Sequence, residues 1–141
     1  VGTKAYIVMP SNAPIIKKNG VKALNGEIIE CEPTLEARES TVQKIIDEKG
    51  ATFVHPFNNY DVIAGQATAA KELIEEVGDL QVVMAPVGGG GLLSGTALTT
   101  HYLLPNAEVI AGEPEGAADA ILSFKSGKIE KAPYIKTIAD G

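Results

Sequence analysis

Residues 80–95 read LQVVMAPVGGGGLLSG, and this stretch decides the class of fold. Its first eight residues are an apolar run of strand length, which is typical of a strand buried on both faces of a parallel sheet. A helical pattern continues after the glycines to about Leu104. Consecutive glycines let the backbone direct several N–H groups into one concavity, and the start of a helix adds partial positive charge. The stretch therefore predicts a phosphate-binding loop, formed by Gly88, Gly89, Gly90 and Gly91.

Strand and helix patterns alternate along the rest of the chain. This alternation predicts βαβ crossovers, and hence an α/β fold of parallel sheets with helices on both faces. A break near residues 56–60 separates three short strands from two strongly apolar ones, which suggests two sheets. The expected strands cover residues 4–9, 27–31, 52–55, 80–87 and 107–112. The expected helices cover residues 14–24, 35–49, 62–77, 91–104 and 115–124, with Ser11–Pro14 capping the first and Asp61 the third.

Composition excludes several classes of function. The chain has 18 acidic and 12 basic residues, a net charge of −6, and no basic stretch longer than Lys17-Lys18, so we expect no nucleic-acid partner. No apolar run approaches the roughly 20 residues of a membrane helix, so we expect no membrane span. Cys31 is a single cysteine without a Cys/His cluster around it, which favours a cytoplasmic location and excludes a structural zinc.

Two other phosphate-binding motifs can be tested against the glycine loop. A Walker loop requires Gly-Lys-Ser/Thr after its first glycine, but Gly95-Thr96 follow Gly90 without a lysine. The dinucleotide pattern GxGxxG also fails, because Leu93 or Ser94 stands where the third glycine belongs. Glu113, at the end of the next strand, would suit a ribose hydroxyl, so a Rossmann-type nucleotide-binding domain remains an alternative.

A second candidate site follows the strand at residues 107–112. Glu113 and Asp119 lie six residues apart around a turn with Pro114 and Gly116. Their carboxylates, with a backbone carbonyl between them, would suit a hard divalent cation such as Mg²⁺ or Ca²⁺. An acidic surface turn at the start of a helix explains the same residues equally well.

Several motifs together resemble one enzyme family. APVGGGGLLSG (85–95) is preceded by HPFNNYDVIAGQATAAKEL (55–73) and followed by EVIAGEPEGAADA (108–120) and TIADG (137–141). AYIVMPSNAP (5–14) and CEPTLEARES (31–40) stand near the front of the chain in the matching order. The chain thereby resembles the fold-type II pyridoxal phosphate enzymes, specifically serine racemases and the related serine/threonine dehydratases.

The resemblance implies a tryptophan synthase β-like fold that is incomplete, with residues 1–57 in a small domain and 58–141 in a large, cofactor-phosphate-binding domain. It implies pyridoxal 5′-phosphate as cofactor, cradled by Gly88–Gly91. It also implies that Glu113, the carbonyl of Ala117 and Asp119 bind Mg²⁺ or Ca²⁺. The implied reaction interconverts L- and D-serine, or eliminates water to give pyruvate and ammonia, and the implied parent enzyme is a homodimer acting on a small amino acid.

The family's Schiff-base lysine lies in a Ser-x-Lys-x-Arg-Gly motif that this sequence does not contain. Ser123–Gly127 imitates part of the motif but lacks the arginine and follows the glycine loop, so Lys125 is expected to be a solvated surface lysine. We therefore expect no catalytic residue in this chain, which would be an internal segment that is inactive alone.

Some residues leave the choice of activity open. Phe57 stands where mammalian-type racemases have an asparagine and resembles the dehydratase-like HPF pattern, so racemase and dehydratase both remain possible. Gly20 and Leu24 depart from the nucleotide-effector site of animal racemases, which puts regulation by ATP in doubt. A non-catalytic α/β module that keeps the loop as scaffold and binds a partner protein is a third hypothesis. His55, His101 and Cys31 are expected to be structural.

Overall fold

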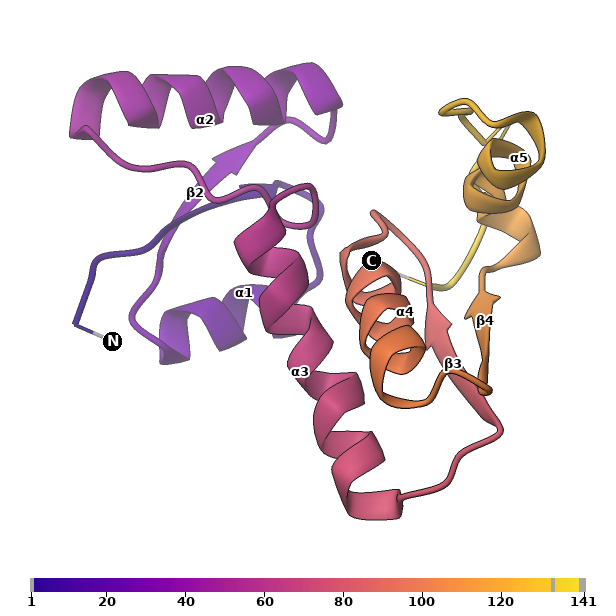
Figure 1. Ribbon diagram of the computed structural model, residues 1–141. Helices are drawn as coiled ribbons and strands as arrows, with labels where there is room; N and C mark the ends of the chain where they lie inside the picture. Colours follow the sequence, from indigo (N-terminus) through magenta and orange to yellow (C-terminus); the bar gives the residue numbers. More distant parts are fainter. Residues whose placement is uncertain (1, 133, 140–141) are drawn as a thin grey trace. The chain divides into compact units, whose positions relative to one another are not determined.

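The computed structural model describes residues 2–132 and 134–139. The chain divides between Phe53 and Val54 into two compact units. Each unit contains one pair of parallel strands joined through a helix (Figure 1). The α/β class with parallel strands is confirmed. None of the described helices is long and apolar enough to cross a membrane.

In the first unit, β1 (Tyr6–Pro10) pairs with β2 (Glu27–Cys31) through the crossover helix α1 (Ile15–Ala23). Helix α2 (Leu35–Lys49) packs on both strands, and Figure 1 shows it on the opposite side of the pair from α1. Gly50 ends α2 in the left-handed conformation, at φ 62°. The expected side-chain cap of α1 is wrong, because Pro14 occupies the N-cap position without a capping hydrogen bond.

Among the described residues of the first unit, two ion pairs connect β2 to other segments. Lys18 Nζ donates hydrogen bonds to Glu30 Oε1 and to the Ser11 carbonyl, each at 2.8 Å. Lys4 Nζ lies 2.8 Å from Glu27 Oε2. The hydrogen bonds from these lysines hold the pKa of Glu30 and of Glu27 below the ordinary glutamate range. These pairs tie β2 to its neighbours, but they lie at the surface, where ion pairs add little stability.

In the second unit, α3 (Tyr60–Val77) leads to β3 (Val82–Pro86), which pairs with β4 (Glu108–Gly112) through the crossover helix α4 (Gly91–Leu103). Helix α4 lies between α3 and the strand pair (Figure 1). A 3₁₀ turn at Glu115–Ala117 and helix α5 (Asp119–Ser126) follow β4. The sequence predicts one helix over residues 115–124. The 3₁₀ turn lies within this range, and α5 extends two residues beyond it.

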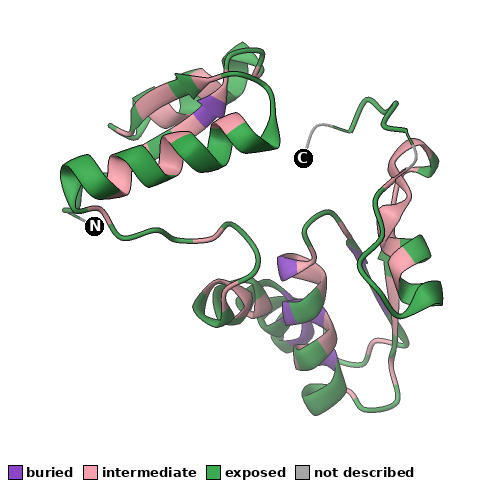
Figure 2. Ribbon diagram, turned by 90° about the horizontal axis from the view of Figure 1, so that it is seen from above, coloured by how far each residue is buried: buried purple, intermediate pink, exposed green. Residues whose placement is uncertain are grey.

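The second unit holds most of the buried residues, as the purple segments in Figure 2 show. Val83 and Ala85 of β3 are buried on the side that α4 covers. Val82 and Met84 alternate with them and are 46% and 68% exposed. The expectation of a strand buried on both faces is therefore wrong for the described residues, because α4 covers one face of the pair and leaves the other open.

Two further local expectations are wrong. Residues 52–55 do not form a strand, because a strand needs a hydrogen-bonded neighbour and the division between the units falls between Phe53 and Val54. The N-cap of α3 is Asn59 and not Asp61, since Asn59 Oδ1 accepts the N–H groups of Asp61 and Val62 at 2.8 and 3.2 Å. Asp61 lies instead in the first turn, where its charge suits the helix dipole.

Candidate functional site

The glycine loop lies at the carboxyl end of β3 and the amino end of α4, as the sequence predicts. The Val87 N–H still bonds to the Gly112 carbonyl of β4 at 2.9 Å, and the Ser94 N–H makes the first helical bond, to the Gly90 carbonyl, at 2.8 Å. Gly90 has φ 89° and is the N-cap of α4. An L side chain disfavours this conformation, so the loop requires glycine at position 90.

The backbone N–H groups between these two hydrogen bonds are available to a ligand. Those of Gly88–Gly91 donate to no other residue within the described part of the chain. They lie where a helix amino terminus concentrates partial positive charge. A phosphate dianion fits such a donor set without a lysine, so the residues present suit the phosphate group of pyridoxal phosphate.

The side chain of Phe57 packs against the glycine loop. A Cβ atom at Gly89 would overlap the Phe57 ring, and a Cβ atom at Gly91 would lie 3.1 Å from the Cα and Cβ atoms of Phe57. These two positions therefore need glycine because of Phe57. The sequence pattern did not reveal this contact, because it joins residues more than thirty positions apart.

The acidic turn after β4 is ordered around Glu113. Its carboxylate accepts the N–H groups of Ala120 and Ile121, at 2.7 and 3.0 Å, and so caps the start of α5. Glu113 and Asp119 are half-buried, whereas Glu115 is exposed. Among the residues that the structure describes, no three His, Cys, Asp or Glu side chains converge as a metal site. Each Glu113 oxygen keeps a second lone pair, so the carboxylate can still bind a cation.

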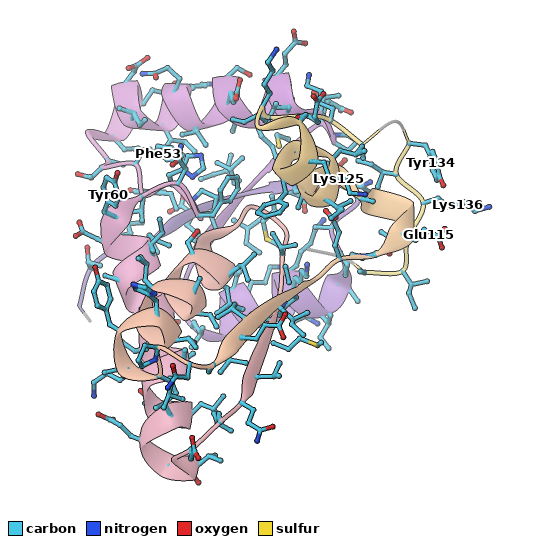
Figure 3. The ribbon with its side chains drawn as sticks, turned by 45° about the vertical axis from the view of Figure 1, so that its right-hand side comes forward. Phe53, Tyr60, Glu115, Lys125, Tyr134 and Lys136 are labelled. Atoms are coloured by element: carbon cyan, nitrogen blue, oxygen red, sulfur yellow. The ribbon has the colours of Figure 1, made fainter. Side chains whose placement is uncertain are left out.

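The turn is closed by a segment near the end of the chain. The Lys136 N–H donates to the Gly116 carbonyl at 2.8 Å, and a Cβ atom at Gly116 would overlap the Lys136 backbone. Figure 3 shows Tyr134 and Lys136 beside Glu115. This close backbone contact explains the glycine at position 116. The last two residues of the TIADG motif, 140 and 141, lie outside the described residues.

The remaining candidates fall on the surface or in structural roles. Lys125 is exposed on α5, as expected (Figure 3). His101 stacks edge-on against Tyr102 with ring centroids 5.1 Å apart. Cys31 is half-buried, with Sγ 3.6 Å from the Met9 carbonyl. His55 Nδ1 accepts two backbone N–H groups. Its place before Pro56 is a signal for a turn of this kind, but the sequence interpretation did not include this role.

Comparison with known families defines the class of protein. Residues 1–141 match the family described as "Pyridoxal-phosphate dependent enzyme". The chain belongs to this family. Membership agrees with the loop at the end of β3 and replaces the Rossmann-type alternative.

Individual relatives are similar over almost the whole of this chain. The chain is 51% identical over 140 residues to a beta-hydroxyaspartate dehydratase from Paracoccus denitrificans, covering 99% of this chain and 44% of that protein. It is 47% identical over 140 residues to a serine racemase from Dictyostelium discoideum, covering 98% of this chain and 43% of that one. The structure of maize serine racemase superposes with a TM-score of 0.95 at 41% identity, over 99% of this chain and 43% of that one. The chain thus spans less than half the length of these relatives.

Proposed function

We propose that this chain forms the phosphate-binding and cation-binding part of a pyridoxal phosphate enzyme that racemises serine or dehydrates a 3-hydroxy amino acid such as serine or threonine. The observation that carries the proposal is the run of unbonded N–H groups at Gly88–Gly91, in a chain whose relatives include a serine racemase and a hydroxyaspartate dehydratase. Dehydration of serine gives pyruvate and ammonia. The two activities share the removal of the proton on the α-carbon, so the loop serves either.

The loop would hold the phosphate and so fix where the cofactor ring lies. Gly90 at φ 89° and the helix that starts at Gly91 fix this backbone, which would reduce the reorganisation needed when the anion binds. Bound pyridoxal phosphate withdraws electrons from the substrate's α-carbon and makes its proton acidic. The contribution of this chain is binding and orientation, because it holds no Ser-x-Lys-x-Arg-Gly motif.

The cation site is a second part of the proposal. Glu113, the Ala117 carbonyl and Asp119 would bind Mg²⁺ or Ca²⁺, which both prefer oxygen ligands. Glu113 already fixes the start of α5 through Ala120 and Ile121, so an ion there would link β4 to α5. Its expected effect is on stability.

Residues 1–57 would belong to a small domain and 58–141 to a large one, and the rest of a cytoplasmic, homodimeric enzyme would supply the lysine and complete the sheets. The division of the described chain between Phe53 and Val54 lies near the proposed boundary. The Pro56–Tyr60 segment would then connect the two domains.

The glycine loop can be tested with a matched pair of variants in the complete enzyme. Gly90→Ala and Gly50→Ala both place alanine in the left-handed conformation, with no atom within 4 Å of the new Cβ. Each should cost about 1–2 kcal/mol of stability. We expect only Gly90→Ala to weaken pyridoxal phosphate binding, by about tenfold, measured by absorbance titration and by pyruvate and D-serine formation. Equal cofactor affinity in the two variants would contradict the proposed loop.

The cation site can be tested by thermal unfolding with and without Mg²⁺ or Ca²⁺. A bound ion raises the melting temperature of the form that binds it. We expect the increase in the wild type and in Glu115→Gln, whose side chain is exposed, and its loss in Asp119→Asn. The same increase in all three proteins would show that the ion binds elsewhere.

A further inference from the structure

His55 and Phe57 form a short turn just before α3. His55 Nδ1 accepts the N–H of Asn58 at 2.8 Å and that of Phe57 at 3.3 Å. The two rings meet edge to face, with centroids 4.5 Å apart and an interplanar angle of 88°. Pro56 has no N–H, so the acceptor bonds to the first two N–H groups that follow it.

These hydrogen bonds assign a role to one nitrogen of the imidazole. Nδ1 is the acceptor for the two backbone N–H groups that follow Pro56. The side chain thus accepts hydrogen bonds at Nδ1 and also packs its ring against the ring of Phe57. Replacements can separate these two roles.

The same kind of acceptor occurs again four residues later. Asn59 Oδ1 accepts the N–H groups of residues two and three positions ahead, Asp61 and Val62. His55 Nδ1 accepts from Phe57 and Asn58, which also lie two and three positions ahead. The segment is therefore fixed at both ends, by His55 at its start and by Asn59 where α3 begins.

Phe57 connects this turn to the glycine loop. Its ring occupies the space that a side chain at Gly89 would need, and its Cα and Cβ atoms lie against Gly91. The unbonded N–H groups of Gly88–Gly91 belong to this same piece of backbone. A shift of Phe57 would remove the contact that supports the loop from this side.

We propose that His55 is a positioning residue, whose Nδ1 holds Phe57 against Gly89 and Gly91 and thereby keeps the glycine loop in its anion-binding shape. The proposal rests on the proposed function of the loop. It assigns Gly89 and Gly91 to contact with Phe57, and Gly90 to the left-handed turn. His55 acts through Phe57 and does not contact the cofactor phosphate.

Two variants of the complete enzyme separate the roles of His55. His55→Phe keeps an aromatic ring but loses the acceptor, whereas His55→Asn keeps an acceptor of the kind seen at Asn59 and loses the ring. Losing one to two net hydrogen bonds corresponds to about a tenfold change in an equilibrium. We therefore expect His55→Phe to weaken pyridoxal phosphate binding by about tenfold and His55→Asn to stay within about threefold of the wild type.

A measurement on the cofactor-free enzyme keeps the positioning role separate from the function of the loop. ¹⁵N relaxation of Gly88–Gly91 should show faster internal motion in His55→Phe and in Phe57→Ala, and wild-type motion in His55→Asn. Unchanged loop motion in His55→Phe, or equal motion in both His55 variants, would overturn the role of His55. Increased motion in His55→Phe with unchanged cofactor affinity would support the positioning role and refute the phosphate-binding function of the loop.

Discussion

In the second unit α4 packs between α3 and a strand pair, whereas in the first unit neither α1 nor α2 contains a buried residue. The first unit buries Met9 alone among its described apolar side chains, and the second buries Ala70, Ile74, Val83 and Ala85 (Figure 2). The helices differ because α3 and α4 approach each other through Gly95. Packing of α3 on α4 therefore depends on close backbone contact at Gly95, whereas the helices of the first unit pack through half-buried side chains.

The largest expected effect comes from Gly95→Ala. A Cβ atom there would lie 2.6 Å from the Ala67 nitrogen and 2.7 Å from the Ile63 carbonyl oxygen. Neither backbone atom can move without displacing α3, so we expect a loss of about 3 kcal/mol, at the upper end of overpacking costs. Urea unfolding measures the loss. Gly65→Ala, in α3 with no atom within 4 Å of the new Cβ, is the control and should stabilise slightly through helix propensity.

The next largest expected effect concerns a buried polar side chain on α4. Thr100 is fully buried, and its Oγ1 has no hydrogen-bond partner among the described residues. Thr100→Val removes this hydroxyl at nearly constant volume and should stabilise the protein by about 1 kcal/mol. Thr99→Val is the comparison, because Thr99 Oγ1 donates to the Ala67 carbonyl at 3.2 Å and its loss should destabilise. Thermal unfolding measures both changes. A melting temperature of Thr100→Val below that of the wild type would mean that the Thr100 hydroxyl has a hydrogen-bond partner.

The same glycine-to-alanine change should have the opposite sign in the first unit. Gly20 lies inside α1, where no atom would come within 4 Å of an added Cβ. Alanine there gains helix propensity, so Gly20→Ala should stabilise α1 by about 0.5–1 kcal/mol. Native-state hydrogen exchange can locate the gain in α1. Destabilisation would show that α1 is packed as closely as α4.

The smallest effect concerns the pH dependence of the first unit. Lys18 keeps the pKa of Glu30 below its ordinary value, so the pair's stabilisation is present above the usual glutamate range, about pH 4.3, and is lost as the pH falls through the lowered pKa. The difference in unfolding free energy between the wild type and Lys18→Met should therefore narrow as the solution becomes more acidic. Lys44→Met removes a longer ion pair within α2, with Lys44 Nζ 3.8 Å from Glu48 Oε1, and should show less narrowing. A constant difference across this pH range would mean that the ion pair contributes no stability.

Much of the fold follows from local patterns. The positions of α2 and α3, the glycine that ends each of them, and the strand–loop–helix order around Gly88–Gly91 were predictable, because propensity and backbone freedom act over a few residues. The solvated Lys125 was predictable because the Ser123–Gly127 stretch lacks the arginine of the lysine motif and follows the glycine loop. The failed strand at residues 52–55 shows the limit, since a strand depends on a partner elsewhere in the chain.

The sequence by itself determined the α/β class, the location of the glycine loop and the acidic turn that follows β4. Only the tertiary structure decided which contact each glycine serves: Phe57 for Gly89 and Gly91, the left-handed turn for Gly90, α3 for Gly95 and the Lys136 backbone for Gly116. It also decided that Met84 lies on an open face of β3 and that His55 Nδ1 accepts the N–H groups of Phe57 and Asn58. The reason is physical. A glycine in the sequence shows only that no side chain is present at that position. The group that fills the space comes from residues far away in the chain.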